Sequence, residues 1–261
     1  MIDESQNLYY ITYAIISGLL GIAYLKFQSS SQSFTIITTK EFKQFQTSFL
    51  LGYSLIILCE LIANASFYHT LIDLGLSLEQ ITKLYLVTLF STTFTSVAAD
   101  VIDIGSKKDK CILSAILYSI AMFSLLFGSP GHYEMLLMGR IVYGAASSLQ
   151  HSSFEAYAVQ QHTSLGFPDD WLTQTFSFLT HIMSITACLS GVFGQMTSSI
   201  GGPRGCPAFC SFVFILTAGY LAISWDKDAT HSPRYILYGI YITVHFLDSC
   251  WQASPLIFPP Q

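Results

Sequence analysis

The chain has 261 residues, of which 52% are hydrophobic and only 10% are charged, and its net charge is −5. A soluble domain carries about 25% charged residues, so this composition is that of a protein buried in a lipid bilayer. The eleven Lys and Arg residues are scattered along a chain of net negative charge, which excludes a basic surface for nucleic acid. Most of the six cysteines fall inside apolar runs, which favours buried thiols over disulfides or a metal site.

Eight apolar stretches are long enough, at about 1.5 Å per residue, to cross about 30 Å of hydrocarbon. Each must be a helix, because in lipid the backbone has to hydrogen-bond to itself. The predicted spans cover residues 8–27, 46–69, 81–102, 111–128, 133–157, 174–200, 207–225 and 235–256. The expected fold class is therefore an all-α polytopic membrane protein.

The basic residues outside the spans favour one orientation. If residues 28–45 face the cytoplasm, strict alternation places eight Lys and Arg on that side, two on the other side and one in the membrane. The cytoplasmic set comprises Lys26, Lys40, Lys43, Lys107, Lys108, Lys110, Lys227 and Arg234, and the external pair is Lys83 and Arg204.

The span at 133–157 holds an arginine, a histidine and a glutamate within an apolar run. Offsets of four, four, three and four put these on one helix face, made of Arg140, Gly144, Ser148, His151 and Glu155. A charge near the middle of a membrane costs at least about 2.5 kcal/mol, so we expect this face to point into a protein interior or a water-filled pathway.

Three further spans carry polar stripes. They consist of Glu60 and Asn64 with Tyr53 and Tyr68, of Gln174, His181 and Gln195, and of Tyr241, His245, Asp248 and Gln252. A single such residue is explained by a structural hydrogen bond between helices as readily as by a polar cavity. Four stripes together favour a shared polar cavity, because several polar faces must be hidden from lipid at once.

The charges in this cavity indicate an anionic cargo. Arg140 stays protonated, and its planar fork suits an oxyanion. We expect the pathway around it to be lined by Glu60, Asn64, Tyr53, Ser148 and His151. Glu155 and Asp248 would repel an anion unless they are protonated or paired, so they are candidates for proton coupling or charge balance. A plain structural Arg–Glu pair is an equal alternative.

An enzymatic function is not predicted. Asp100 and Asp103, three residues apart, are similar to a metal-binding acidic pair of membrane transferases, but no second acid-rich motif accompanies them. The sequence therefore predicts no metal and no cofactor.

Several motifs resemble those of a known family. The loop D-I-G-S-K-K at 103–108 resembles the cytoplasmic D-R-x-G-R-K motif of major facilitator transporters, with Ser106 in place of a glycine. L-x-x-x-R-x-x-x-G at 136–144 resembles that family's fourth-helix motif, with Arg140 in the arginine position. C-I-L-S from Cys111, S-F-E-A-Y at 153–157 and F-P-D-D-W at 167–171 are similar to the molybdate-anion branch of the superfamily. The resemblance covers about residues 45–200.

This resemblance implies uptake of molybdate across the plasma membrane by alternating access, in a multi-pass protein whose cytoplasmic side is latched by Asp103, Lys107 and Lys108. Because family members have two six-helix halves, we expect a truncated chain. Its parts would be a leading helix and linker at 1–44, an N-terminal six-helix half at 45–225, and the first helix of an incomplete second half at 226–261. Two alternatives remain open. The chain could transport nothing and bind a second copy or a longer homologue, or it could carry another solute, such as an organic anion or a sugar.

Overall fold

The structure, a computed structural model, describes residues 39–101 and 106–225, with the backbone alone at 99–101. The predicted spans at 8–27 and 235–256, and the candidate residues Asp103 and Asp248, lie outside the described residues. The chain divides into two compact units, the first ending at Gln44 and the second beginning at Phe45, and the arrangement below is that of the second unit.

The described ranges are helical and contain no strand. Their elements are α2 (Lys40–Asp73), α3 (Leu78–Val101), α4 (Lys107–Phe127), η1 (Pro130–His132), α5 (Tyr133–Ser164), α6 (Asp169–Gly201), η2 (Gly202–Arg204) and α7 (Gly205–Ser224). The predicted all-α class is confirmed. Each of the six central predicted spans lies on one α-helix and extends beyond that helix by no more than one residue, while the helices themselves are up to seven residues longer at an end.

Local sequence sets several of the helix ends. Gly75, at φ +86°, makes the turn after α2. A reciprocal capping box then starts α3, in which the Ser77 backbone N–H donates to Gln80 Oε1 (3.0 Å) and the Gln80 N–H donates to Ser77 Oγ (3.4 Å). At the start of α4, the Ser106 hydroxyl accepts from the backbone N–H of Asp109 (3.2 Å).

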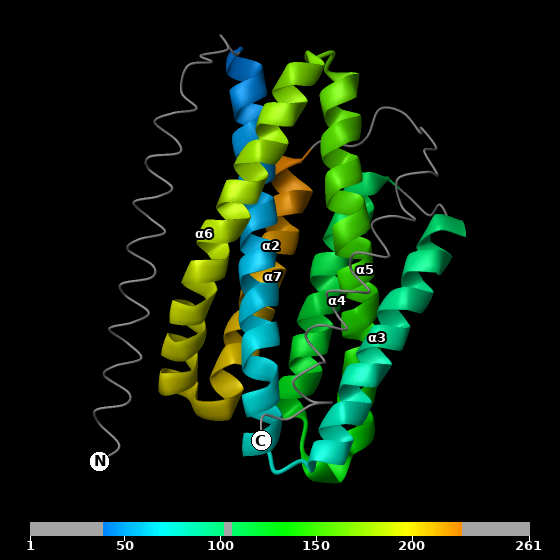
Figure 1. The fold of residues 1–261 in the computed structure, drawn as a ribbon, viewed down its shortest axis with the longest axis vertical. Helices are drawn as coiled ribbons and strands as arrows, with labels where there is room; N and C mark the ends of the chain where they lie inside the picture. The colour runs from blue at the N-terminus through cyan, green and yellow to red at the C-terminus, as the bar shows by residue number, and fades with distance from the viewer. Residues whose placement is uncertain (1–38, 102–105, 226–261) are drawn as a thin grey trace, which may run out of the picture. The chain divides into compact units, whose positions relative to one another are not determined.

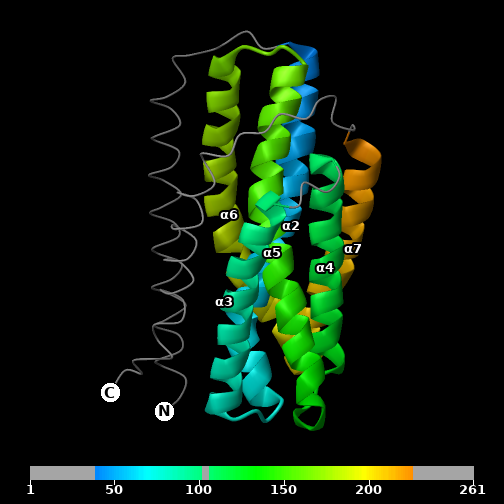
Figure 2. The ribbon, with the colours of Figure 1, turned by 90° about the vertical axis from the view of Figure 1, so that its right-hand side faces the viewer.

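The six helices stand in two rows of three (Figures 1 and 2). One row contains α6, α2 and α7, and the other contains α3, α5 and α4, so that α2 and α5 are the central pair. Packing is extensive between α4 and α5, between α3 and α5, and between α4 and α7. Side chains that face inward from α2 and α5 therefore meet at the centre of the unit.

The surface of this unit fits a lipid environment. Large apolar side chains point outward, for example Phe90 (71% exposed), Phe94 (76%) and Ile223 (87%). Three stretches of the described residues are long and apolar enough to cross a membrane, namely Lys40–Asp73, Lys107–Phe127 and Asp169–Ser224, the last of which comprises α6, η2 and α7. Helices α3 and α5 are not among these stretches, and their sequences are rich in Ser, Thr and ionisable residues.

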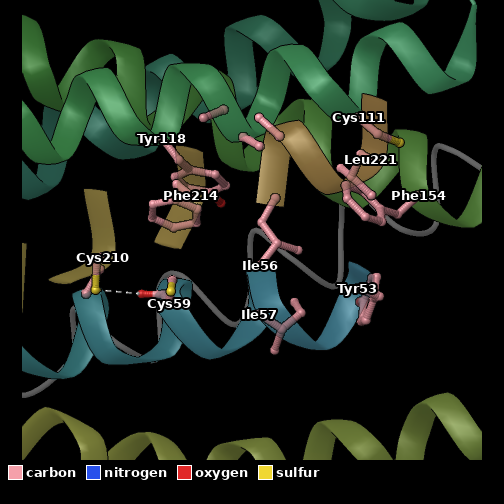
Figure 3. Close-up of a cluster of buried hydrophobic side chains, with 14 of the residues drawn as sticks. Tyr53, Ile56, Ile57, Cys59, Cys111, Tyr118, Phe154, Cys210, Phe214 and Leu221 are labelled. Atoms are coloured by element: carbon pink, nitrogen blue, oxygen red, sulfur yellow. Dashed lines mark hydrogen bonds between the residues drawn. The ribbon is translucent and has the colours of Figure 1, made fainter. Parts of the chain in front are cut away.

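The apolar core lies among α2, α4, α5 and α7 (Figure 3). The rings of Tyr118 and Phe214 stack with their centroids 4.8 Å apart, and both side chains are fully buried. The Cys210 thiol donates to the backbone carbonyl of Cys59 (3.5 Å), as the dashed line in Figure 3 marks. No disulfide joins any two of the five cysteines in the described ranges.

A clamp holds the last turn of α7, where backbone carbonyls lack partners within the helix. The Lys108 ammonium, on α4, donates to the carbonyls of Ala222 (2.9 Å) and Trp225. The Trp225 indole is buried, stacks on Tyr157 with a centroid distance of 4.2 Å, and donates from Nε1 to the Ser48 carbonyl on α2 (3.4 Å). One lysine and one tryptophan thus join this end of α7 to α2, α4 and α5.

Candidate functional site

The guanidinium of Arg140 lies inside the bundle. Arg140 is 7% exposed, and its Nε donates to the Thr88 hydroxyl on α3 (2.9 Å). The central guanidinium carbon lies 3.7 Å from the centroid of the Phe67 ring and 4.3 Å from that of Tyr143. No carboxylate of residues 39–98 or 106–225 forms an ion pair with it, so the Arg–Glu pair left open by the sequence is not formed there.

A close approach of two helices places Arg140 beside Thr88. A Cβ added at Gly144, one turn beyond Arg140, would lie 2.6 Å from the Thr88 carbonyl oxygen and 2.8 Å from Ser91 Cβ. The Ser91 hydroxyl also donates to the Ile141 carbonyl across the same seam (2.6 Å). Glycine is therefore required for α5 to lie this close to α3.

A second polar group surrounds Glu60 on α2. Glu60 is 7% exposed, and its Oε2 accepts from Gln150 Nε2 (2.9 Å). Its Oε1 lies 3.5 Å from both Ser147 Oγ and His151 Nε2. The three partners share one face of α5, because their offsets are three and four residues.

Tyr143 lies between the two groups. Its ring flanks the Arg140 guanidinium, while its hydroxyl donates to Asn64 Oδ1 (2.8 Å). Asn64 follows Glu60 by one helical turn on α2. Ser147 follows Arg140 by seven residues, about 10 Å along the helix axis, so the Arg140 group and the Glu60 group occupy different depths of the bundle.

The electrostatics of the two groups differ. Glu60 has an imidazole and a donating amide beside it, whereas Arg140 has one neutral hydroxyl and two rings. Cation–π contact and a charge-assisted hydrogen bond are each worth about 2 kcal/mol when desolvated, which offsets much of the cost of burying the cation. These neutral partners leave its full positive charge in place. An anion beside the guanidinium would neutralise that charge.

The remaining predicted residues lie elsewhere. Tyr53 is buried against Phe154 (centroids 5.6 Å apart), and its hydroxyl donates to Met183 Sδ (3.8 Å). Ser148 is buried on α5, and Glu155 is half-buried, one turn beyond His151.

On the side predicted to be cytoplasmic, Lys107 is half-buried and Lys108 binds the end of α7. No group of three or more His, Cys, Asp or Glu side chains in the described part of the chain is placed to hold a metal ion.

Four residues of the candidate site are not among the predicted ones: Phe67, Thr88, Tyr143 and Gln150. Gln150 could have been found, because an amide inside an apolar run has to be hidden from lipid in the same way as His151 beside it. Tyr143 lies three residues after Arg140 and therefore on a neighbouring part of the same face. Thr88 carries no such signal, because α3 contains many threonines.

Comparison with known proteins gives the family of this chain. A protein-family model of the major facilitator type, described as sugar transporters with 12 TM, matches residues 8–232. The chain is 27% identical over 172 residues to a molybdate-anion transporter of Danio rerio, a match that covers 64% of this chain and 35% of the relative. It is 25% identical over 225 residues to the molybdate-anion transporter of Xenopus tropicalis, covering 83% of this chain and 49% of the relative.

The chain thus spans a third to a half of the length of these curated relatives. The family match, by contrast, extends over most of the chain and includes all six described α-helices. The helical fold, the apolar outer surface and the family match lead to one conclusion: this membrane protein belongs to the major facilitator family of transporters.

Proposed function

We propose that this chain is part of a multi-pass plasma-membrane transporter that carries a tetrahedral oxyanion of the molybdate type by alternating access. The observation that carries the proposal is the buried Arg140 guanidinium, which has no carboxylate partner in the described ranges. The names of the curated relatives support an oxyanion substrate. Arg140 would bind the anion, and Asn64 and Tyr143 would line the pathway toward Glu60.

The chemistry of the Arg140 group suits such a substrate. Nε is held by Thr88, and the rings of Phe67 and Tyr143 flank the guanidinium carbon. These contacts fix the plane of the fork, so its remaining N–H donors are oriented before a ligand arrives. Pre-oriented donors lose little conformational entropy on binding two oxygens of one oxyanion.

A binding experiment on the full chain tests this proposal. Purified protein in detergent is titrated with sodium molybdate by calorimetry, and the Arg140→Gln variant is compared with Arg204→Gln. Arg204 is an exposed arginine at η2 and serves as the matched control. Loss of a charge-assisted contact should weaken binding at least about tenfold in Arg140→Gln and leave Arg204→Gln unchanged. Equal affinities in both variants would refute the assignment.

A second candidate substrate is a sugar, favoured by the description of the matching family. Neutral sugars bind amide and hydroxyl groups flanked by rings, and Asn64, Tyr143 and Phe67 provide these. Uptake of radiolabelled molybdate into proteoliposomes, with competition by tungstate, sulfate and glucose, separates the two. The oxyanion proposal expects tungstate to compete and glucose not to. Glucose competition that is lost on Tyr143→Ala would favour the sugar. Binding without any flux would favour the non-transporting alternative.

A further inference from the structure

The Arg140 guanidinium keeps hydrogen-bond donors that no described residue uses. Its Nε–H donates to the Thr88 hydroxyl, and the rings of Phe67 and Tyr143 lie against its central carbon. Thr88 in turn donates its own proton to the Leu84 carbonyl (2.9 Å), so toward Arg140 its hydroxyl acts as an acceptor. The terminal nitrogens of Arg140 make no hydrogen bond within the described ranges. Their N–H groups therefore remain for a ligand.

A phenol on α3 lies next to this guanidinium. Tyr85 precedes Thr88 by three residues, so the two side chains share one face of α3. The Tyr85 ring packs edge to face with Phe67, with centroids 5.1 Å apart and planes at 75°, and Phe67 is the ring that lies against Arg140. Tyr85 and Arg140 are also close enough to interact electrostatically. One aromatic ring thus connects the phenol to the cation.

The hydroxyl of Tyr85 is an unused donor. Tyr85 is half-buried, and its hydroxyl makes no hydrogen bond to any residue of the described ranges. The Tyr143 hydroxyl, by contrast, donates to Asn64 Oδ1 (2.8 Å) and is therefore occupied. A tyrosine in partly apolar surroundings usually finds a partner for its O–H. The Tyr85 hydroxyl thus has a proton to donate to a ligand that binds beside Arg140.

A guanidinium and a phenol respond to different properties of an anion. The guanidinium attracts any negative charge, whereas the strength of a hydrogen bond from the phenol depends on how strongly the anion's oxygen accepts. Molybdate is a dianion with strongly accepting oxygens. Perrhenate has the same tetrahedral shape, but it is a monoanion and the conjugate base of a strong acid, so its oxygens accept weakly. A phenol beside the cation would therefore favour molybdate over perrhenate by more than the difference in charge alone.

We propose that Tyr85 is a further anion-binding residue, which donates a hydrogen bond to the oxyanion held by Arg140 and selects doubly charged, strongly accepting oxyanions. This inference rests on the proposed function, because it requires an anion at Arg140. Arg140 supplies the charge, Thr88 holds the orientation of the guanidinium, and Tyr85 adds a neutral donor that leaves the charge of the site unchanged.

The test compares the affinities of the purified full chain for sodium molybdate and sodium perrhenate, measured by calorimetry in detergent. Tyr85→Phe removes one oxygen atom that has no partner among the described residues, so the variant should fold. It should weaken molybdate binding at least about tenfold, the loss expected for a hydrogen bond to a charged group. The ratio of molybdate to perrhenate affinity should fall at least about threefold. Arg140→Gln should weaken the binding of both anions.

The matched control is Tyr220→Phe. Tyr220 is a half-buried tyrosine on α7 whose hydroxyl donates to the Ser48 carbonyl on α2 (3.3 Å), and it takes no part in the Arg140 group. The control should keep both affinities.

Three outcomes would contradict the role of Tyr85. A Tyr85→Phe variant that keeps the wild-type affinity for molybdate would overturn it. Equal weakening of both anions in this variant would show a merely structural role and would overturn it as well. In either case, loss of molybdate binding in Arg140→Gln would leave the anion site standing. A wild-type protein that binds no molybdate would overturn both the anion site and the role of Tyr85.

Discussion

At the scale of single residues, the hydroxyls of Tyr143 and Tyr118 provide a matched pair. Both rings are buried and pack edge to face, with centroids 5.0 Å apart. The Tyr143 hydroxyl donates to Asn64, whereas the Tyr118 hydroxyl lies beside Glu60 and Ser147 but makes no hydrogen bond of ordinary geometry with a described residue. The two phenols therefore differ in hydrogen bonding while their apolar surroundings are similar.

This difference gives a prediction for stability. Tyr143→Phe should lower the free energy of unfolding by about 0.6 kcal/mol, and by no more than about 1.7, the range found for hydrogen bonds between membrane helices. Tyr118→Phe should be neutral or slightly stabilising, because a buried polar atom without a partner is removed. Thermal unfolding of both variants in the same detergent measures the effect. A larger loss in Tyr118→Phe would contradict the hydrogen-bonding scheme.

Individual residues also show how far the sequence can predict the site. The sequence predicts that Arg140 and Glu60 are hidden from lipid, because a charge in an apolar run has to avoid it, and both side chains are buried. Tyr53 shares the face of Glu60 but lies seven residues away, about 10 Å along the axis. It therefore packs among aromatic rings. Sequence periodicity predicts which face of a helix a residue occupies. It does not predict which side chain of another helix that residue contacts at a given depth of the bundle.

At the scale of helices, Gly144 sets the distance between α5 and α3. The contacts of Thr88 with Arg140 depend on this register, which the sequence of either helix alone does not specify. For this reason the six helices could be predicted from hydropathy, while the threonine that holds Arg140 could not.

The close contact between α5 and α3 predicts how one added methyl group at Gly144 would change the stability of the protein. Gly144→Ala should destabilise the protein by about 1–3 kcal/mol, because the new Cβ would overlap the α3 backbone. Gly219→Ala in α7 is the control, since a Cβ there meets nothing within 4 Å. The control should be neutral or stabilising, because alanine favours helix over glycine. Unfolding midpoints of the two variants provide the measurement, and equal midpoints would show that α5 and α3 are not in close contact.

At the scale of the whole molecule, alternation of the helices predicts which turns face the same compartment. The turn between α2 and α3 carries Ser77, and the segment before α4 carries Ser106, next to the basic group Lys107, Lys108 and Lys110. The proposed multi-pass topology puts the basic group in the cytoplasm, because positive residues are retained on that side.

Cysteine labelling tests this topology in intact cells. Ser77→Cys should react with a membrane-impermeant maleimide added outside, and Ser106→Cys should react only after the membrane is permeabilised. Cys188, the exposed cysteine among the described residues, is replaced by serine in both variants. Labelling of both positions from the same side would rule out an odd number of crossings between them.

The clamp at the end of α7 has a practical consequence for following this protein at work. The Trp225 indole is held face to face with Tyr157, and its N–H is bonded to α2. Because indole emission responds to its immediate surroundings, any rearrangement that separates α7 from its neighbours would change the colour and intensity of the light emitted by Trp225. The intrinsic fluorescence of Trp225 can therefore be used to follow movement of α7 without an attached dye.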